Sequence, residues 1–292
     1  MDANEPGLKL TFLGTGTSAG VPMIGCDCPV CTSADPRDRR DRSSVVVSYP
    51  DEAGTERVYL IDTTPDLRHQ AIRAGMRRLD GVLITHSHAD HIYGLDDLRR
   101  FNAVMDGPID VWMEPRVRET VTRSFQHIFE PHKNVNDSWI AQLIARPLVP
   151  GERIQLPDGD ASRGATWTPL RLMHGRLPIV GFRVDHDGGS LAYCTDVSTI
   201  PPETWPLLEN LDVLVIDGLR ERHHPTHLTF DQAAEAIERA APKRAYLTHI
   251  AHDFSHADIA DRLPEGIEPA YDGLVVEVGG LSVGQPASEL AG

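Results

Sequence analysis

The chain has 292 residues, of which 40% are hydrophobic and 24% are charged, and its formal net charge is −15. This size suits one large α/β domain or two small ones, and the negative charge argues against a nucleic-acid partner, since duplex binding usually needs a basic face. No apolar run approaches the roughly 18 residues that cross a bilayer. The acidic residues 1–6 lack the pattern of a secretory signal peptide. We therefore expect a cytoplasmic protein without a membrane segment.

Short apolar, β-branched runs alternate along the chain with longer amphipathic stretches, which predicts an α/β fold. Helices are predicted at residues 66–74, 115–125 and 230–240, and residues 95–101 are predicted to begin another helix. Thr229 precedes the helix at 230–240 as an N-cap, and Gln232 stands three residues on, which is the spacing of a capping box. Strands are predicted at residues 8–13, 44–48, 58–61, 81–84, 109–112, 170–173, 180–184, 191–195, 213–216, 245–248 and 274–278.

The first predicted strand leads into Gly14-Thr15-Gly16-Thr17. Such a loop can present backbone N–H groups to a phosphate, but it fits a plain tight turn equally well.

Three of the four cysteines form a CxCxxC motif, at Cys26, Cys28 and Cys31. A disulfide framework is disfavoured, because a CxC pair is awkward to bridge and the chain is long enough to build its own core. Three converging thiolates predict a tetrahedral zinc with one further ligand, which His252 supplies; such a closed Cys3His site is structural. The alternative is three reduced cysteines in a flexible loop. Cys194 is expected to be a buried core residue.

The run Thr85-His86-Ser87-His88-Ala89-Asp90-His91 places three imidazoles and a carboxylate directly after the predicted strand 81–84. Sites in α/β folds are built where strands end. This loop can serve two adjacent cations, one bound by His86 and His88 and the other by Asp90 and His91. The alternative is a histidine-rich surface loop.

The HxHxDH motif resembles that of the metallo-β-lactamase superfamily. The resemblance implies an αββα sandwich, two mixed sheets with helices outside, formed by residues 1–292 as a single domain. It also implies further ligands after later strands, at His174, Asp196 and His249. One metal is then bound by His86, His88 and His174, and the other by Asp90, His91 and His249. Asp196 bridges the two metals, and Asp62 orders the metal-binding loop.

A narrower resemblance rests on the opening residues 10–22, the CxCxxC motif, the HxHxDH motif and the pair His249 and His252. Together they resemble the phosphoribosyl 1,2-cyclic phosphate phosphodiesterases of the carbon–phosphorus lyase pathway and their close relatives. Proteins of pyrroloquinoline quinone biosynthesis share a similar cysteine-rich opening. His227 falls where the phosphodiesterases carry a histidine facing the substrate phosphate, with His223 and His224 as alternatives.

These observations predict a dinuclear hydrolase with two divalent cations, Mn or Zn, and one structural Zn. A metal-bridging hydroxide would attack a small, cyclic ribosyl phosphodiester. Asp196 would bridge the metals, and His227 would protonate the leaving ribose oxygen. The expected partner is this small-molecule substrate, and a homodimer stays open. Two alternatives remain: another hydrolase on the same scaffold, acting on a nucleic acid, cyclic nucleotide or thioester, and a non-catalytic cofactor-biosynthesis protein.

Overall fold

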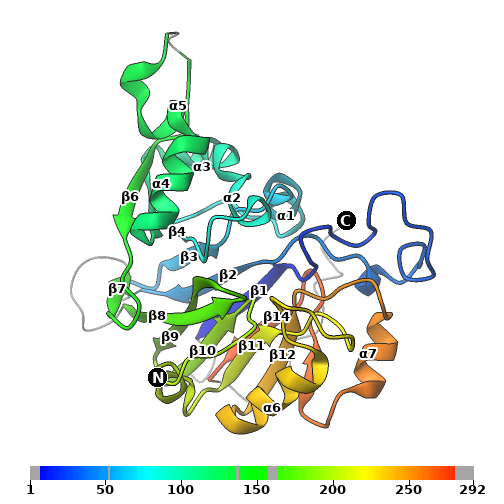
Figure 1. The fold of residues 1–292 in the computed structure, drawn as a ribbon. Coiled ribbons are helices and arrows are strands. Elements are labelled where there is room, and N and C mark those ends of the chain that lie inside the picture. The colour runs from blue at the N-terminus through cyan, green and yellow to red at the C-terminus, as the bar shows by residue number, and fades with distance from the viewer. Residues whose placement is uncertain (1–6, 52, 136–137, 157–163, 280–292) are drawn as a thin grey trace.

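The computed structural model describes residues 7–51, 53–135, 138–156 and 164–279. Two mixed sheets of seven strands each lie face to face (Figure 1). The first has the order β14-β1-β2-β3-β4-β5-β6, and its strands β3 to β6 are parallel to one another. Its strands are β1 (Leu8–Gly14), β2 (Ser44–Pro50), β3 (Glu56–Ile61), β4 (Gly81–Leu83), β5 (Ile109–Met113), β6 (Leu143–Pro147) and β14 (Val275–Val278).

The second sheet has the order β13-β12-β11-β10-β9-β8-β7. Strands β10 to β13 are parallel, whereas β7 to β10 form an antiparallel meander. Its strands are β7 (Ile154–Leu156), β8 (Ala165–His174), β9 (Leu177–His186), β10 (Gly189–Cys194), β11 (Val213–Asp217), β12 (Arg244–Thr248) and β13 (Ile267–Pro269).

Helices cover the outer faces of both sheets. Against the first lie α1 (Leu67–Arg73), α2 (Ala89–Ile92), α3 (Arg99–Met105), α4 (Pro115–Ser124) and α5 (Gln126–Phe129). Against the second lie α6 (Phe230–Ala240) and α7 (His256–Arg262). Short 3-10 helices occur at Pro36–Asp38, Leu95–Leu98, Pro131–Lys133 and Trp205–Leu208. Within the described ranges, no helix is long and apolar enough to cross a membrane.

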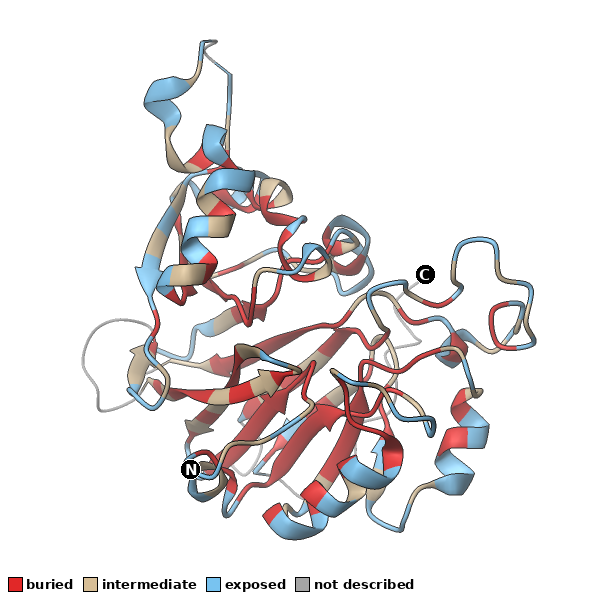
Figure 2. Ribbon diagram, in the orientation of Figure 1, coloured by how far each residue is buried: buried red, intermediate tan, exposed pale blue. Residues whose placement is uncertain are grey.

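The strands of both sheets are largely buried (Figure 2), and their side chains form three apolar layers. The central layer lies between the sheets, where Phe12 and Tyr59 meet Phe182 and Tyr193. The outer layers join each sheet to its helices. Strands β10 and β11 are buried along their whole length, which explains why they are continuous apolar runs rather than alternating patterns. The predicted αββα sandwich is confirmed.

Every predicted strand is present, with ends shifted by a few residues, whereas β6, β7 and β13 were not predicted. Strands β7 and β13 have only three residues each, and β6 is a half-exposed edge strand whose Arg146 pairs with Asp110. The prediction that a helix begins within residues 95–101 is confirmed. A 3-10 turn at Leu95–Leu98 leads into α3, which continues to Met105 and ends at the left-handed Asp106.

The glycine loop after β1 packs closely against the backbone of residues 40–42. A Cβ on Gly14 would lie 2.0 Å from the carbonyl oxygen of Arg42, and one on Gly16 would lie 2.5 Å from that of Arg40. The Gly16 N–H donates to the carbonyl of Asp41 at 2.8 Å. Only glycine allows the two backbone segments to approach so closely.

The parallel strands of both sheets end at the same edge of the sandwich. Here the N–H of Val180 in β9 donates to the carbonyl of Thr85, just beyond β4, at 3.1 Å. This hydrogen bond joins the two sheets beside the histidine-rich loop. Polar side chains that follow β3, β4, β10, β11 and β12 are therefore brought to one place.

Candidate active site and metal centres

The candidate ligands of the dinuclear site all lie at strand ends or in the segment after β4. Their ligand atoms form two groups, in each of which all atoms lie within 4.8 Å of one another. The first group contains His86, His88 and His174, and the second contains Asp90, His91, Asp196 and His249. The structure thus brings together all seven residues that the sequence singled out.

Asp196 lies where the two groups meet. Its Oδ1 is 3.2 Å from Nε2 of His249, and its Oδ2 is 3.4 Å from Nε2 of His91. The rings of His86 and His91, one from each group, are 4.1 Å apart between centroids. Asp196 also shares a cluster with His174 and His227. This central position is the one that a bridging carboxylate requires.

The donor set fits metal ions. Nε2 of His86, of His91 and of His249 is buried and makes no hydrogen bond within the described residues, although Asp196 lies within ion-pair distance of the last two. An unpaired polar atom in the interior costs free energy, so such groups normally have a partner. Imidazole nitrogens and carboxylate oxygens together suit divalent metals such as Zn or Mn. A bound cation would satisfy these atoms.

Residues behind the ligands set their orientation. Asp62 accepts hydrogen bonds from the N–H and hydroxyl of Thr85, both at 2.8 Å, and from Nδ1 of His91 at 2.7 Å. Nδ1 of His174 donates to the carbonyl of Thr226 at 2.8 Å. Each bond leaves Nε2 as the nitrogen that faces the site. Asp62 therefore lies where the resemblance to the superfamily placed it.

Backbone conformation directs three of these side chains inward. Asp62, Asp196 and His249 have φ angles of 64°, 59° and 59°, in the left-handed region. Non-glycine residues rarely adopt this region, and where they do the strain often marks a functional site. At each position the chain turns sharply as it leaves a strand, which places the side chain at the sheet edge.

The electrostatics of the site favour a cation. Burial alone would lower the pKa of His91, but the carboxylates of Asp196, Asp62 and Asp90 raise it well above its usual value. Burial would raise the pKa of Asp196, but His249 and His91 hold it well below its usual range. The buried carboxylates thus create a negative potential where the imidazoles converge.

His227 lies beside the metal cluster and is held by a residue that the sequence analysis missed. Its Nδ1 is 2.6 Å from Oδ2 of Asp217, the last residue of β11. Its ring stacks on that of His249, with centroids 4.5 Å apart and planes at 14°. Asp217 follows an apolar run in the same way as Asp196, so the pattern that identified Asp196 was also present here.

The other two histidines of this segment lie farther from the cluster. His223 is exposed. His224 is half-buried, its ring centroid is 5.0 Å from that of His227, and its Nδ1 is 3.1 Å from the hydroxyl of Thr226. Of the three candidates, only His227 has a ligand atom grouped with those of His174 and Asp196.

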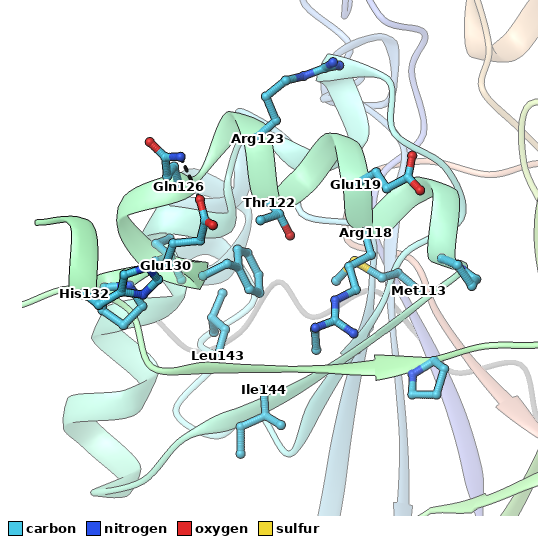
Figure 3. A pocket seen from close by; sticks show the side chains of 16 residues that line it. Met113, Arg118, Glu119, Thr122, Arg123, Gln126, Glu130, His132, Leu143 and Ile144 are labelled. Atoms are coloured by element: carbon cyan, nitrogen blue, oxygen red, sulfur yellow. Dashed lines mark hydrogen bonds between the residues drawn. The ribbon is translucent and has the colours of Figure 1, made fainter.

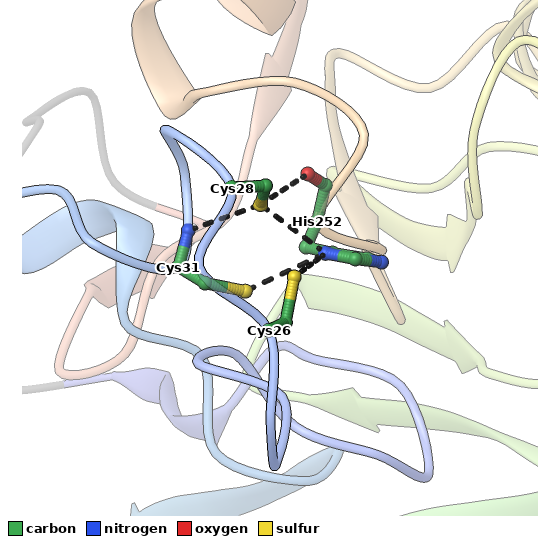
Figure 4. Close-up of side chains that lie close together, drawn as sticks. All are labelled: Cys26, Cys28, Cys31 and His252. Atoms are coloured by element: carbon green, nitrogen blue, oxygen red, sulfur yellow. Dashed lines mark hydrogen bonds between the residues drawn. The ribbon is translucent and has the colours of Figure 1, made fainter.

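The Cys3His cluster forms a second, separate centre (Figure 4). Nδ1 of His252 is 3.4 Å from the sulfur of each of Cys26, Cys28 and Cys31. A tetrahedral zinc with ordinary Zn–S and Zn–N bonds would separate S and N by about 3.5 Å. The N–H of Cys31, opposed by partial burial, lowers the pKa of Cys28 to about 6 and favours its thiolate form. The four residues therefore fit a zinc ion.

Cys194 is fully buried in the second sheet, as expected for a core residue, and burial raises the pKa of its thiol to about 12.

A cavity of about 1130 Å³ opens away from both clusters, between α4 and the edge strand β6 (Figure 3). It is lined by residues such as Arg118, Thr122 and Leu143, and by none of the candidate metal ligands.

Comparisons with known proteins agree with this geometry. A model described as "Beta-lactamase superfamily domain" matches residues 57–250. The crystal structure of a diphosphatase from the PhnP family is similar, with a TM-score of 0.80 and 40% identity, and the match covers 92% of this chain and 97% of that one. Zn(2+)-bound PqqB from Methylobacterium extorquens shares the fold at TM-score 0.70 and 19% identity, over 92% of this chain and 99% of that one.

An octanoyltransferase of Porphyromonas gingivalis is 36% identical over 269 residues, which are 91% of this chain but 51% of that protein. This chain thus spans about half the length of that relative, so the relative's name does not by itself describe the matching half. The superfamily match, the shared fold and the metal-ligand geometry agree: this chain belongs to the β-lactamase superfamily and, within it, to the PhnP family of metal-dependent hydrolases.

Proposed function

We propose that this chain is a phosphodiesterase that hydrolyses a small phosphodiester, with a cyclic ribosyl phosphate as the leading candidate. The observation that carries the proposal is that a group of three histidines and a group of His and Asp residues, both mostly buried, meet at Asp196, with His227 directly beside them. The net charge of −15 supports a small substrate rather than a nucleic acid.

The residues that would hold the metals are those of the two groups, with Asp196 shared between them. When bound, two divalent cations polarise the phosphoryl oxygens and supply an activated water at neutral pH. Asp62 and the carbonyl of Thr226 keep His91 and His174 in the tautomers that direct Nε2 to the site. The chain therefore provides a rigid frame that aligns the phosphorus centre for in-line displacement.

Cleavage of a ribosyl ester leaves an alkoxide that needs a proton. Asp217 binds Nδ1 of His227, so Nε2 is the nitrogen available to a substrate. Before cleavage, the Asp217 carboxyl group and the His227 imidazole must together hold two protons. One is shared between Asp217 and Nδ1, and the other is on Nε2. His227 then gives the Nε2 proton to the leaving oxygen, as a general acid. Asp217 does not touch the substrate and acts by positioning His227.

A second candidate is cleavage of a diphosphate bond, which the 40% identical diphosphatase of the PhnP family favours. The two reactions share the attack at phosphorus but differ in the leaving group. A phosphate leaving group needs less protonation than a ribose alkoxide. A side chain placed to donate a proton is therefore more useful to the phosphodiesterase, which is why we place that reaction first.

A substrate panel tests the proposal. The purified protein, loaded in turn with Mn²⁺ and Zn²⁺, is assayed on a ribosyl cyclic phosphate, a nitrophenyl phosphodiester, a dinucleoside diphosphate, an acyl thioester and a short RNA. Asp196→Ala serves as the metal-site control. We expect turnover of the phosphodiesters that this variant lacks. Preference for the diphosphate would establish the second candidate, and activity confined to the thioester or RNA would refute both.

A further inference from the structure

Arg40 is a fully buried arginine between the two metal centres. Its side chain has 0% of its surface exposed and lies 3.5 Å from the carboxylate of Asp38, which is itself almost entirely buried. A buried guanidinium is expensive unless its donors are used. The hydrogen bonds that Arg40 makes therefore indicate its role in the structure.

Arg40 holds the segment that carries one ligand of each centre. In the short loop 249–252, His249 belongs to the His/Asp site and His252 to the Cys3His site. Nη1 of Arg40 donates to the carbonyl of Ala251 at 2.5 Å, between these two ligands, and Nη2 donates to that of Phe254 at 3.1 Å. The two terminal nitrogens of the guanidinium group thus hold the backbone at two points just after His249, at Ala251 and at Phe254.

The backbone of Arg40 contacts the other side of the Cys3His centre. Its N–H and carbonyl pair with the carbonyl and N–H of Val21, both at 2.8 Å. Val21 packs with Cys31 in a small apolar cluster beneath the cysteine loop. Arg40 is therefore bonded both to the loop that carries the thiolates and to the loop that carries His252.

We infer that Arg40 is a positioning residue that couples the two metal centres, so that metal bound by the cysteines strengthens metal binding by His249 and its partners. This inference rests on the metal sites of the proposed function. A metal at the Cys3His site fixes His252. The guanidinium fixes Ala251 and Phe254, and the N–H of Ile250 is held by the carbonyl of Thr15 at 2.8 Å. The left-handed backbone of His249 is then fixed from its C-terminal side.

Cobalt binding tests this coupling without an activity assay. Co²⁺ is the probe, because thiolate-to-cobalt charge transfer reports the Cys3His site separately from the weaker bands of the His/Asp site. The affinity of the His/Asp site is measured by chelator competition in the wild type, Arg40→Lys, Arg40→Met, Cys28→Ser and the double variant Arg40→Lys/Cys28→Ser. Arg40→Lys keeps the charge but loses the fork that spans two carbonyls.

We expect each single variant to weaken Co²⁺ binding at the His/Asp site about tenfold or more. The double variant should be weakened by less than the product of the single effects, because both act through one loop. Arg57→Met is the matched control: this arginine bonds Asp51 and Asp80 at the far end of β3. Its loss should lower stability without changing the affinity for cobalt.

Wild-type affinity in folded Arg40→Lys, or effects that multiply in the double variant, would overturn the coupling. If Cys28→Ser lost affinity for cobalt while the Arg40 variants did not, the coupling would bypass Arg40, and this result would also overturn the inference. If Arg40→Met does not fold, Arg40→Lys decides. Failure of the wild type to bind Co²⁺ at the His/Asp site would instead refute the proposed function, so the two failures are distinct.

Discussion

Oδ2 of Asp217 lies 2.6 Å from Nδ1 of His227, and both residues are buried. Asp217 ends β11, whereas His227 lies ten residues later in the loop that leads to α6. The contact orients the imidazole and presents Nε2 to the cluster of His174 and Asp196. An imidazole positioned in this way can act as a proton donor.

Replacement of His227 by alanine should leave the fold and the metal content intact but lower kcat on a ribosyl phosphodiester by roughly 10²–10⁴, the usual effect of losing a general acid. The loss should be much smaller on a nitrophenyl ester, whose leaving group needs little protonation. Steady-state kinetics on both substrates measures the difference. The exposed His223→Ala variant is the control and should behave as the wild type.

Three other results would each assign a different role. An equal loss on both substrates, mainly in KM, would mean that His227 binds the phosphate rather than donating a proton. No change on either substrate would remove His227 from the mechanism. A defect in His224→Ala beside an unaffected His227→Ala would identify His224 as the donor.

The Asp217→Asn variant should show the same dependence on the leaving group, with a smaller loss than His227→Ala. Asparagine fills the same space but cannot hold the second proton of the pair, so Nε2 is less often protonated. The double variant Asp217→Asn/His227→Ala should be no worse than His227→Ala alone, because Asp217 acts only through His227. Additive losses in kcat would show that Asp217 has a separate role.

Asp196→Ala and His88→Ala should each abolish turnover on every substrate, because each removes a side chain that would bind metal at the centre of the site. Activity and metal content are measured on the same samples. Residual activity within tenfold of the wild type, with the metal confirmed lost, would place the chemistry elsewhere.

Mild chelation should remove metal from the His/Asp site before it removes zinc from the Cys3His site. Thiolates bind zinc tightly, and a closed tetrahedral site offers no open position to a chelator. Cys28→Ser should therefore lower soluble yield and the midpoint of thermal unfolding. Elemental analysis checks this, since a triple Cys→Ser variant that retains all its zinc would contradict the assignment.

The stability of the protein should decline on acidification in part through His256. Burial, together with Arg37 and Arg40, lowers the pKa of this histidine to about 4 in the folded state. The unfolded chain takes up a proton near pH 6.5, whereas the folded chain does not, so stability is lost between about pH 6.5 and pH 4. His256→Phe, which can keep the ring contact with Tyr271, should flatten this part of the curve.

Urea unfolding at several pH values measures the slope. His69→Phe on α1 is the matched control, because it makes the same substitution at an exposed position. An unchanged slope in His256→Phe would show that other groups cause the acid sensitivity.

Much of the candidate site could be predicted from the sequence because its signals are local. The HxHxDH motif follows β4 within a few residues, and CxCxxC confines three thiolates to one loop. The capping box of α6 is likewise a contact between Thr229 and Gln232, and the structure contains it with the predicted helix bounds. Such features depend on spacing along the chain, which the sequence displays directly.

Other features depended on the tertiary structure. The contact between Asp217 and His227 requires the end of β11 to face the loop before α6, and the segment 223–227 offers three histidines of identical chemistry. Arg40 meets Ala251 across 211 residues of sequence, and nothing near either residue indicates the contact. The edge strand β6 has no apolar alternation, so only its pairing with β5 defines it.

The sequence itself determined the residue types at the metal centres, the alternation of strands and helices, and the helix caps. Each of these is a short-range pattern with its own chemistry. Only the fold decided that His227 lies at the cluster, that Asp217 binds it, and that Arg40 joins the two centres. These choices depend on the packing of two sheets, and packing is a property of distant segments brought together. The sequence of any one segment does not contain that information.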